Sequence, residues 1–407
     1  MLSREFLIKR GHCCGHGCLM CPYVPKHIKD NDEVFIPTKE EDKLILDATK
    51  VYWHQERIKQ WDRGERIVPI TIDMALTRAC NYGCHFCYAR LQENDRFDID
   101  KEVIENFLVD CAEMGVKAIS LVSDGESTLS PVYEYTIIRG AELGLSMAVA
   151  THGYNTRYEA LERILPHLTY LRVNISAGEP KRYAEIMGVK EDYFHQVVQN
   201  IKDMAEIKKK NNLDVTIGMQ MVLMPEDADQ VIPLAKLGKE IRPDYLVVKH
   251  TSDSEEGELG VDYSKYAELT DILEEAEAYS DDEYQVTVKW SKINSEGKRS
   301  YQKCHGAAFQ LQISGSGLVA PCGMFFNEKY SRFHIGNITQ TRFKDIVQSE
   351  KYWEVMNHIS SDNFDAQTMC GSLCLQHKVN EFLDDYKKGL HSLTPPTGNK
   401  PQHINFI

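Results

Sequence analysis

The stretch ITIDMALTRACNYGCHFC at residues 70–87 joins a short apolar run to three closely spaced cysteines. Residues 70–76 have the pattern of a buried strand, and similar runs recur at 118–122, 146–151, 168–175, 215–223 and 245–249. Helical patterns follow these runs at 101–114, 132–143, 157–165, 193–209, 230–240 and 263–277. Six successive strand–helix units predict an α/β fold with a parallel sheet, namely a partial (β/α)6 TIM-like barrel.

The alternation of strands and helices is confined to the middle of the chain, and we expect four regions in all. Residues 1–66 form a short cysteine-rich segment and a wrap without sustained periodicity, and residues 67–283 form the barrel. Residues 284–392 begin with a β-like run at 285–290 and end with helical patterns near 342–359 and 375–388. They predict a separate C-terminal α+β module, followed by a tail at 393–407.

Composition limits the classes of function. The chain has 407 residues with 47 Lys and Arg against 61 Asp and Glu, and the net charge of −14 argues against a broad surface for nucleic acid or anionic membrane. No run reaches the roughly 18 apolar residues of a membrane span, and we see no secretion signal. We therefore expect a cytoplasmic protein, in which 12 closely grouped cysteines indicate metal or iron–sulfur sites rather than disulfides.

Cys80, Cys84 and Cys87 have the spacing CxxxCxxC on the loop after the first strand, where barrel active sites are assembled. This segment resembles the signature of the radical S-adenosylmethionine (SAM) superfamily. The resemblance implies that the three thiolates ligate a 4Fe-4S cluster, that SAM chelates the fourth iron, and that reductive cleavage gives a 5′-deoxyadenosyl radical. A structural zinc site with a fourth ligand such as His85 is the alternative.

Later strand ends carry further segments similar to motifs of this family. Ser123-Asp124-Gly125-Glu126-Ser127 resembles the Gly-Gly-Glu segment that binds the SAM amino group, with Asp124 in place of the first glycine. Thr151-His152-Gly153 lies where members often carry Thr-Asn-Gly, and the segment at 172–178 resembles the one that reaches the SAM carboxylate or ribose. The resemblance thus implies SAM contacts from Phe86, Asp124, Gly125, Glu126, Thr151, Asn174 and Ser176.

The N-terminal thiols Cys13, Cys14, Cys18 and Cys21 also include a CxxxCxxC spacing. No strand precedes them, and Pro22 and Pro25 disfavour the helix that would follow. Four thiols can close a metal site without an open position, so we expect a third iron–sulfur cluster or a structural zinc. A metal-free thiol cluster is a further alternative.

The C-terminal cysteines Cys304, Cys322, Cys370 and Cys374 include the pattern Cx12Gx4C, with Gly317 as its glycine. This pattern resembles the SPASM and twitch modules of radical SAM enzymes, which hold auxiliary 4Fe-4S clusters. A full SPASM module usually has seven cysteines, so four favour one auxiliary cluster, with zinc as the alternative. Residues 311–313 and 318–320 bracket Ser314-Gly315-Ser316-Gly317 and predict a hairpin.

Polar residues at the strand ends indicate a substrate site. We expect Gln220, Lys249 and His250 to line the barrel mouth as catalytic candidates, with Lys249 and His250 able to bind phosphate or act as a base. With an auxiliary cluster to accept an electron, we expect oxidation of a small sugar-like or nucleotide-sugar substrate, driven by a reducing donor such as flavodoxin or ferredoxin. The alternatives are a peptide maturase, an epimerase and a non-enzymatic electron-transfer protein.

Overall fold

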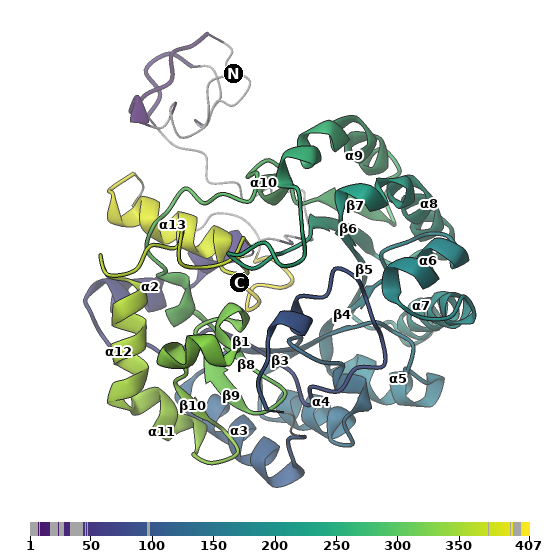
Figure 1. The fold of residues 1–407 in the computed structure, drawn as a ribbon, viewed down its shortest axis with the longest axis horizontal. Helices are drawn as coiled ribbons and strands as arrows, with labels where there is room; N and C mark the ends of the chain where they lie inside the picture. Colours follow the sequence, from purple (N-terminus) through teal and green to yellow (C-terminus); the bar gives the residue numbers. More distant parts are fainter. Residues whose placement is uncertain are drawn as a thin grey trace.

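The computed structural model describes residues 7, 9–16, 23, 28–32, 44, 46, 48–95, 98–372, 374–390, 392–393 and 400–407. Within these residues one sheet of ten strands forms the centre of the molecule, in the order β10-β9-β8-β1-β2-β3-β4-β5-β6-β7 (Figure 1). The strands are β1 Thr71–Met74, β2 Ala118–Leu121, β3 Ser146–Thr151, β4 Leu168–Asn174, β5 Thr216–Leu223, β6 Tyr245–His250, β7 Gln285–Val288, β8 Gln310–Ile313, β9 Leu318–Ala320 and β10 Gly336–Asn337. The first eight pair in parallel, which confirms the predicted barrel and all six of its strands.

Helices cover the outside of the curved sheet (Figure 1). The α-helices are α2 Gln55–Asp62, α3 Lys101–Met114, α4 Tyr133–Glu142, α5 Tyr158–Ile164, α6 Pro180–Met187, α7 Asp192–Asn211, α8 Val231–Ile241, α9 Thr270–Glu277, α10 Trp290–Ile293, α11 Phe343–Gln348, α12 Glu350–Ile359 and α13 His377–Lys387. Short 3-10 turns are η1 Ala48–Trp53, η2 Tyr88–Leu91, η3 Ser127–Leu129, η4 Leu165–His167, η5 Pro225–Gln230, η6 Tyr263–Leu269, η7 Gly306–Ala308, η8 Gly323–Phe325 and η9 Glu328–Phe333. No helix of the described ranges is long and apolar enough to span a membrane.

Local sequence explains the helix boundaries, as α3 illustrates. The Asp100 side chain accepts a hydrogen bond from the Val103 N–H at 2.9 Å, which caps the start of the helix. Such a cap contributes about 1 kcal/mol. Gly115 ends α3 in the left-handed conformation, with φ of 87°, which an L-residue with a Cβ adopts only at a cost.

Four parts of the chain differ from the sequence-based expectation. The run at 285–290 does not begin a separate sheet, because β7 pairs in parallel with β6, and β8 pairs in parallel with β1 on the other edge. The C-terminal region thus extends the barrel sheet at both ends. The wrap at 22–66 contains α2, and α6 was not predicted. The helical pattern at 263–277 is divided between η6 and α9.

The described part of the C-terminal tail, residues 400–407, closes the end of the barrel where the strands begin. Thr71 Oγ1 donates to the Asn405 carbonyl at 2.6 Å, and Asn405 Nδ2 donates to Ser146 Oγ at 3.0 Å. A third strand start is engaged by His403, whose Nε2 lies 2.9 Å from Thr216 Oγ1. Phe406 is 7% exposed and its ring meets that of Tyr170 edge-on. The tail is therefore part of the barrel.

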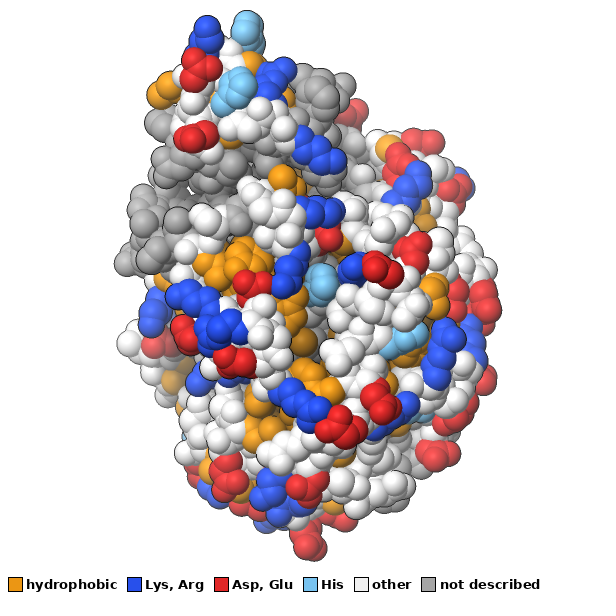
Figure 2. Space-filling model, turned by 90° about the vertical axis from the view of Figure 1, so that its left-hand side faces the viewer, with side chains coloured by type: hydrophobic (Ala, Val, Ile, Leu, Met, Phe, Trp, Pro, Cys, Tyr) orange, Lys and Arg blue, Asp and Glu red, His pale blue; other side chains and the backbone are white. Residues whose placement is uncertain are grey.

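One face of the molecule carries α12 and α13, and Figure 2 shows its surface. Lysine and arginine side chains alternate there with aspartate and glutamate side chains. The described residues of this face form no extended patch of a single sign.

Candidate active site

The three-cysteine loop leaves the carboxyl end of β1 and is fixed against α6. The Gly83 N–H donates to the Met187 carbonyl at 3.2 Å, and the His85 N–H donates to the Ile186 carbonyl at 3.1 Å. Gly83 and Gly188 approach so closely that an added Cβ on Gly188 would collide with the Gly83 backbone. Helix α6, which the sequence reasoning missed, thus sets the position of the loop.

The loop gathers its three thiols at this edge. Cys80 is exposed, whereas Cys84 and Cys87 are half-buried. Burial raises the pKa of the Cys84 thiol, and the neighbouring Cys87 and Cys80 raise it further, so the three sulfurs lie within electrostatic range of one another. Phe86, expected at SAM, is 7% exposed and packs into the hydrophobic core beneath the loop.

Glu126, the carboxylate of the predicted SAM amino-group site, is buried where β2 and β3 end. Its Oε1 accepts hydrogen bonds from the Thr128 N–H at 3.1 Å, the Thr128 hydroxyl at 2.6 Å and the Thr151 hydroxyl at 2.8 Å. Its Oε2 accepts one from the His152 N–H at 3.0 Å. A carboxylate offers about four lone-pair sites, so Oε2 can accept from a further cationic donor.

Gly125 lies directly beside the cysteine loop. An added Cβ at this position would collide with the Thr77 carbonyl oxygen, and the Glu126 N–H donates to the Ala79 carbonyl at 2.9 Å. The close approach of two backbones explains why glycine is required here. The resulting arrangement of loop backbone and Glu126 fits the amino group that the sequence resemblance places there.

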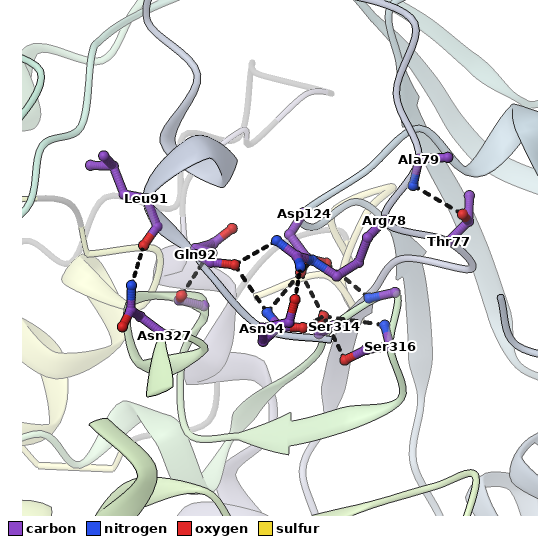
Figure 3. Close-up of polar contacts among 12 residues, drawn as sticks. Thr77, Arg78, Ala79, Leu91, Gln92, Asn94, Asp124, Ser314, Ser316 and Asn327 are labelled. Atoms are coloured by element: carbon purple, nitrogen blue, oxygen red, sulfur yellow. Dashed lines mark hydrogen bonds and ion pairs between the residues drawn. The ribbon is translucent and has the colours of Figure 1, made fainter. Parts of the chain in front are cut away.

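Asp124 has a different role from the expected SAM contact (Figure 3). Its buried carboxylate pairs with Arg78 Nε at 3.0 Å and accepts from the Ser314 hydroxyl at 2.5 Å and the Gly315 N–H at 2.8 Å. Asn94 Nδ2 lies 3.5 Å from the same carboxylate. Asp124 therefore ties the cysteine loop to the β8–β9 hairpin, and its lone pairs are occupied by protein donors.

A second contact reinforces this junction. Gln92, which follows the cysteine loop, donates from Nε2 to the Gly323 carbonyl, next to Cys322. Asn327 Nδ2 donates to the Leu91 carbonyl at 2.9 Å (Figure 3). The segment that leaves the three-cysteine loop is thereby bound to the segment that carries one of the C-terminal cysteines.

The other predicted SAM contacts lie at the carboxyl ends of β3 and β4. Thr151 is engaged by Glu126, as described above. Asn174 Oδ1 accepts from Gln220 Nε2 at 3.2 Å, and Ser176 Oγ accepts from the Val222 N–H at 3.2 Å. The Ser176 and Asn174 side chains therefore stabilise neighbouring strand ends, while the Ser176 hydroxyl retains its proton as a donor.

An aromatic cluster beside the loop was not anticipated from the sequence. The Tyr82 ring stacks on His152 with centroids 3.9 Å apart, and the Tyr82 hydroxyl lies 3.0 Å from that of Tyr183. His152 Nε2 lies 2.8 Å from Asn81 Oδ1. Burial lowers the pKa of His152 despite the nearby Glu126 carboxylate. The neutral imidazole thus spans the distance between Glu126 and the cysteine loop.

The four C-terminal cysteines form a second group. Asn380 on α13 donates from Nδ2 toward Cys304 Sγ at 3.7 Å and Cys374 Sγ at 3.6 Å, which brings these two thiols together. Burial raises the pKa of Cys304 and of Cys370 to about 12, and in both cases the neighbouring Cys374 raises it further. The positive charge of Arg299 opposes both shifts.

Cys322 is the last member of the group. Burial raises the pKa of its thiol, and the neighbouring thiols of Cys374, Cys370 and Cys304 raise it further. Thiols in such surroundings become thiolates when a metal supplies positive charge. No three His, Cys, Asp or Glu side chains in the described ranges lie close enough to hold one metal ion. Four thiols grouped in this way match the four thiolate ligands of a 4Fe-4S cluster.

A cavity of about 820 Å³ occupies the barrel interior. It is lined by Asp73 of β1, Arg172 of β4, Gln220 of β5 and Lys249 of β6, and its lower end is closed by the tail residues Phe406 and Ile407. Asp73 Oδ2 accepts from Gln310 Nε2 at 2.8 Å, and burial raises the pKa of Asp73 to about 6. Asp73 and Arg172 were not assigned a role from sequence, although inward-facing charges within β-strands are a usable signal.

Two of the three catalytic candidates line this cavity, and the third does not. Burial, together with Lys292 and Arg172, lowers the pKa of Lys249. His250 follows Lys249 on the strand and points to the opposite face, where its ring meets Tyr263 and its Nδ1 lies 2.6 Å from the Thr251 carbonyl. The expectation that His250 faces the barrel mouth is therefore wrong, because successive strand residues alternate between faces.

The N-terminal thiols are described in part. Cys13 is buried and Cys14 is half-buried, and both line a hollow of about 380 Å³ together with His12 and His16. Cys18 and Cys21 lie outside the described residues. The metal expected at this segment stays a prediction.

Comparison with known proteins agrees with this geometry. Residues 74–237 match the model of the radical SAM superfamily, and residues 304–374 match the SPASM model, described as an iron-sulfur cluster-binding domain. The chain is therefore a radical SAM enzyme with a C-terminal SPASM module. Such an enzyme binds SAM and 4Fe-4S clusters.

Individual relatives are distant. The sporulation killing factor maturation protein SkfB of Bacillus subtilis is 27% identical over 165 residues, which are 40% of this chain and 38% of SkfB. A SAM-dependent nucleotide dehydratase of Flammeovirga pacifica is 21% identical over 281 residues, 66% of this chain and 86% of that protein. The chain thus spans less than half the length of SkfB.

Solved structures support the fold. Streptococcus suis SuiB bound to SAM superposes with a TM-score of 0.58 at 17% identity, covering 74% of this chain and 71% of SuiB. At that identity the similarity establishes the arrangement of barrel and C-terminal module and does not establish the substrate.

Proposed function

We propose that this protein oxidises a small polar molecule held in the barrel cavity. In this proposal Cys80, Cys84 and Cys87 hold the SAM-binding cluster, while Gly125 and Glu126 receive the SAM amino group. Cys304, Cys322, Cys370 and Cys374 hold an auxiliary cluster. The cofactors, when bound, supply a 5′-deoxyadenosyl radical that removes a hydrogen atom from the substrate and an acceptor for one further electron.

The observation that carries this proposal is the contact between the cavity and the second cysteine group. Lys292 lines the cavity, and its Nζ donates to the Cys374 carbonyl at 3.1 Å. Leu375, directly after Cys374, also lines the cavity. A substrate in the cavity would therefore lie beside the auxiliary cysteines, which favours loss of a hydrogen atom and then an electron, a net two-electron oxidation.

The chain offers groups for the remaining tasks of this oxidation. Conversion of an alcohol carbon to a carbonyl also releases a proton, which Asp73 can accept through Oδ1. Its pKa of about 6 suits that task near neutral pH. Gln220 can orient a substrate hydroxyl, because its side chain lies between the cavity and Asn174. The tail residues Phe406 and Ile407 give the cavity an apolar wall.

Two variants test the proposal after anaerobic reconstitution, with SAM and dithionite added. Cys84→Ala should abolish 5′-deoxyadenosine formation while iron remains at the C-terminal group. Cys322→Ala should retain 5′-deoxyadenosine formation but lose oxidised product, which is two mass units lighter than its substrate. Normal product yield from Cys322→Ala would remove the redox role of the second cysteine group.

Peptide modification is the second candidate, and the likeness to SkfB favours it. A SuiB structure with the same fold also holds a precursor peptide. The barrel cavity, with a volume of about 820 Å³, favours a small molecule instead. The two can be separated by adding the ultrafiltrate or the peptide fraction of a cell extract and measuring which one stimulates 5′-deoxyadenosine formation. Stimulation by the peptide fraction alone would replace our proposal with a maturase.

A further inference from the structure

The barrel cavity concentrates positive charge within an acidic protein. Six lysine and arginine side chains line it against the two carboxylates of Asp73 and Glu277, although the whole chain has a net charge of −14. The basic residues are Lys50, Arg172, Lys249, Lys289, Lys292 and Lys378. Because like charges repel in a confined space, this arrangement costs free energy unless an anion enters.

Two of these cations are available to a ligand. Lys249 makes no hydrogen bond or ion pair with any residue in the described ranges, and Arg172 Nε is buried there without a hydrogen-bond partner. Others are engaged, since Lys378 pairs with Glu381 at 2.6 Å and Lys292 donates to the Cys374 carbonyl. Buried polar groups are ordinarily paired, so the unpaired guanidinium N–H of Arg172, in the same cavity as the unpaired Lys249, indicates a missing acceptor.

The strands place these two side chains in the same cavity. Arg172 lies on β4 and Lys249 on β6, and β5 between them pairs its Gly218 with Arg172 and its Val222 with Lys249. Gly218 leaves space that the Tyr245 ring fills, because an added Cβ would collide with that ring. Tyr170 lies beneath the Arg172 guanidinium, 5.9 Å from it. Arg172 is thus held in the cavity by packing and by the Tyr245 side chain, while its Nε has no hydrogen-bond partner in the described ranges.

We propose that Arg172 and Lys249 bind a phosphate group of the substrate, so that the molecule oxidised is a phosphate ester. This inference rests on the proposed function, since it concerns the same cavity. The basic residues that line the cavity outnumber its carboxylates, which favours entry of a phosphate dianion, and the negative charge of that dianion would favour the ammonium form of Lys249. The guanidinium fork matches two phosphate oxygens, and the ammonium matches a third as a point charge.

Inorganic phosphate is the probe, titrated into the reconstituted holoenzyme by anaerobic calorimetry at constant ionic strength. Acetate serves as the monoanionic comparison. We expect Lys249→Met to weaken phosphate binding about tenfold or more, because a hydrogen bond to a charged group is lost. The matched control is Lys378→Met, a lysine of the same cavity that is already paired, and it should change the affinity by less than about twofold.

A second variant distinguishes loss of phosphate binding from loss of folding. Arg172→Lys keeps the charge but removes the fork, and we expect weaker phosphate binding with an unchanged melting temperature. Equal phosphate affinity in wild type and Lys249→Met would overturn the inference, as would acetate binding as tightly as phosphate. Loss of phosphate binding alone, with 5′-deoxyadenosine still formed, would leave the proposed function standing. The reverse result would remove the proposed function and leave an anion site.

Discussion

The junction at Asp124 gives the most demanding test of the structure. Its carboxylate is fully buried, pairs with an Arg78 side chain that is only 12% exposed, and accepts from the hairpin residues Ser314 and Gly315. Asp124→Asn keeps the shape but removes the charge, so the guanidinium loses its counterion. Removing one partner of a buried pair costs roughly 3–5 kcal/mol. Anaerobic urea unfolding, followed by tryptophan fluorescence, should show that loss as a lower midpoint.

The matched control is Glu134→Gln, which makes the same chemical change in an exposed pair. Glu134 accepts two hydrogen bonds from Arg163 at 2.8 and 3.0 Å, but the two side chains are 38% and 55% exposed. An exposed pair of this kind contributes about 0–1 kcal/mol. If Asp124→Asn lost no more stability than this control, with equal urea dependence, the junction would not join the two cysteine regions as we argue.

Three further outcomes follow from the described contacts. Gly125→Ala should weaken SAM binding in equilibrium dialysis, because the added methyl displaces the cysteine loop; unchanged affinity would contradict the close approach. Asn380→Leu removes the donor to Cys304 and Cys374, so the auxiliary cluster should reduce at a more negative potential in an EPR-monitored titration, whereas no shift would place the cluster elsewhere. The pKa of Asp73 is about 6 in the folded protein, against 3.8 for a free side chain. The folded state is therefore favoured below pH 4, where Asp73 is protonated. It loses about 3 kcal/mol of stability as the pH rises through 6. Asp73→Asn should therefore gain stability at pH 8 and none near pH 4, and equal gains at both would refute that cause.

The regular spacing of apolar residues explains which strands and helices could be predicted from the sequence. The strands of the barrel and helices such as α3 repeat their apolar residues at intervals of two or of three to four, and this local signal located them within two residues. The pairing of β8 with β1 has no such signal, because it depends on the curvature of the whole sheet. Helix α6 is short, begins with Pro180, and owes its position to the loop that it supports.

Some residues of the candidate site could be predicted from the sequence, and others could not. Spacings of three and four residues indicated the group at Cys80, Cys84 and Cys87, whereas the C-terminal group was indicated by its resemblance to SPASM and twitch modules. Strand alternation could have excluded His250, because Lys249 occupies the inward position. The role of Asp124 could not be read from the chain, since its partners Arg78 and Ser314 come from segments that meet only in the folded barrel. Asn380 lies six residues after Cys374, and only the packing of α13 brings it to the sulfurs.

The β1–β8 pairing has a consequence for the order in which the protein is made. Gln310 and Asp73 are joined by a hydrogen bond although 237 residues separate them in the sequence. One edge of β1 therefore has no partner strand while most of the chain is synthesised. Residues 400–407 reach the barrel floor later still. An unpaired strand edge readily captures another chain. This edge of β1 is therefore open to pairing with another chain until β8 has been synthesised.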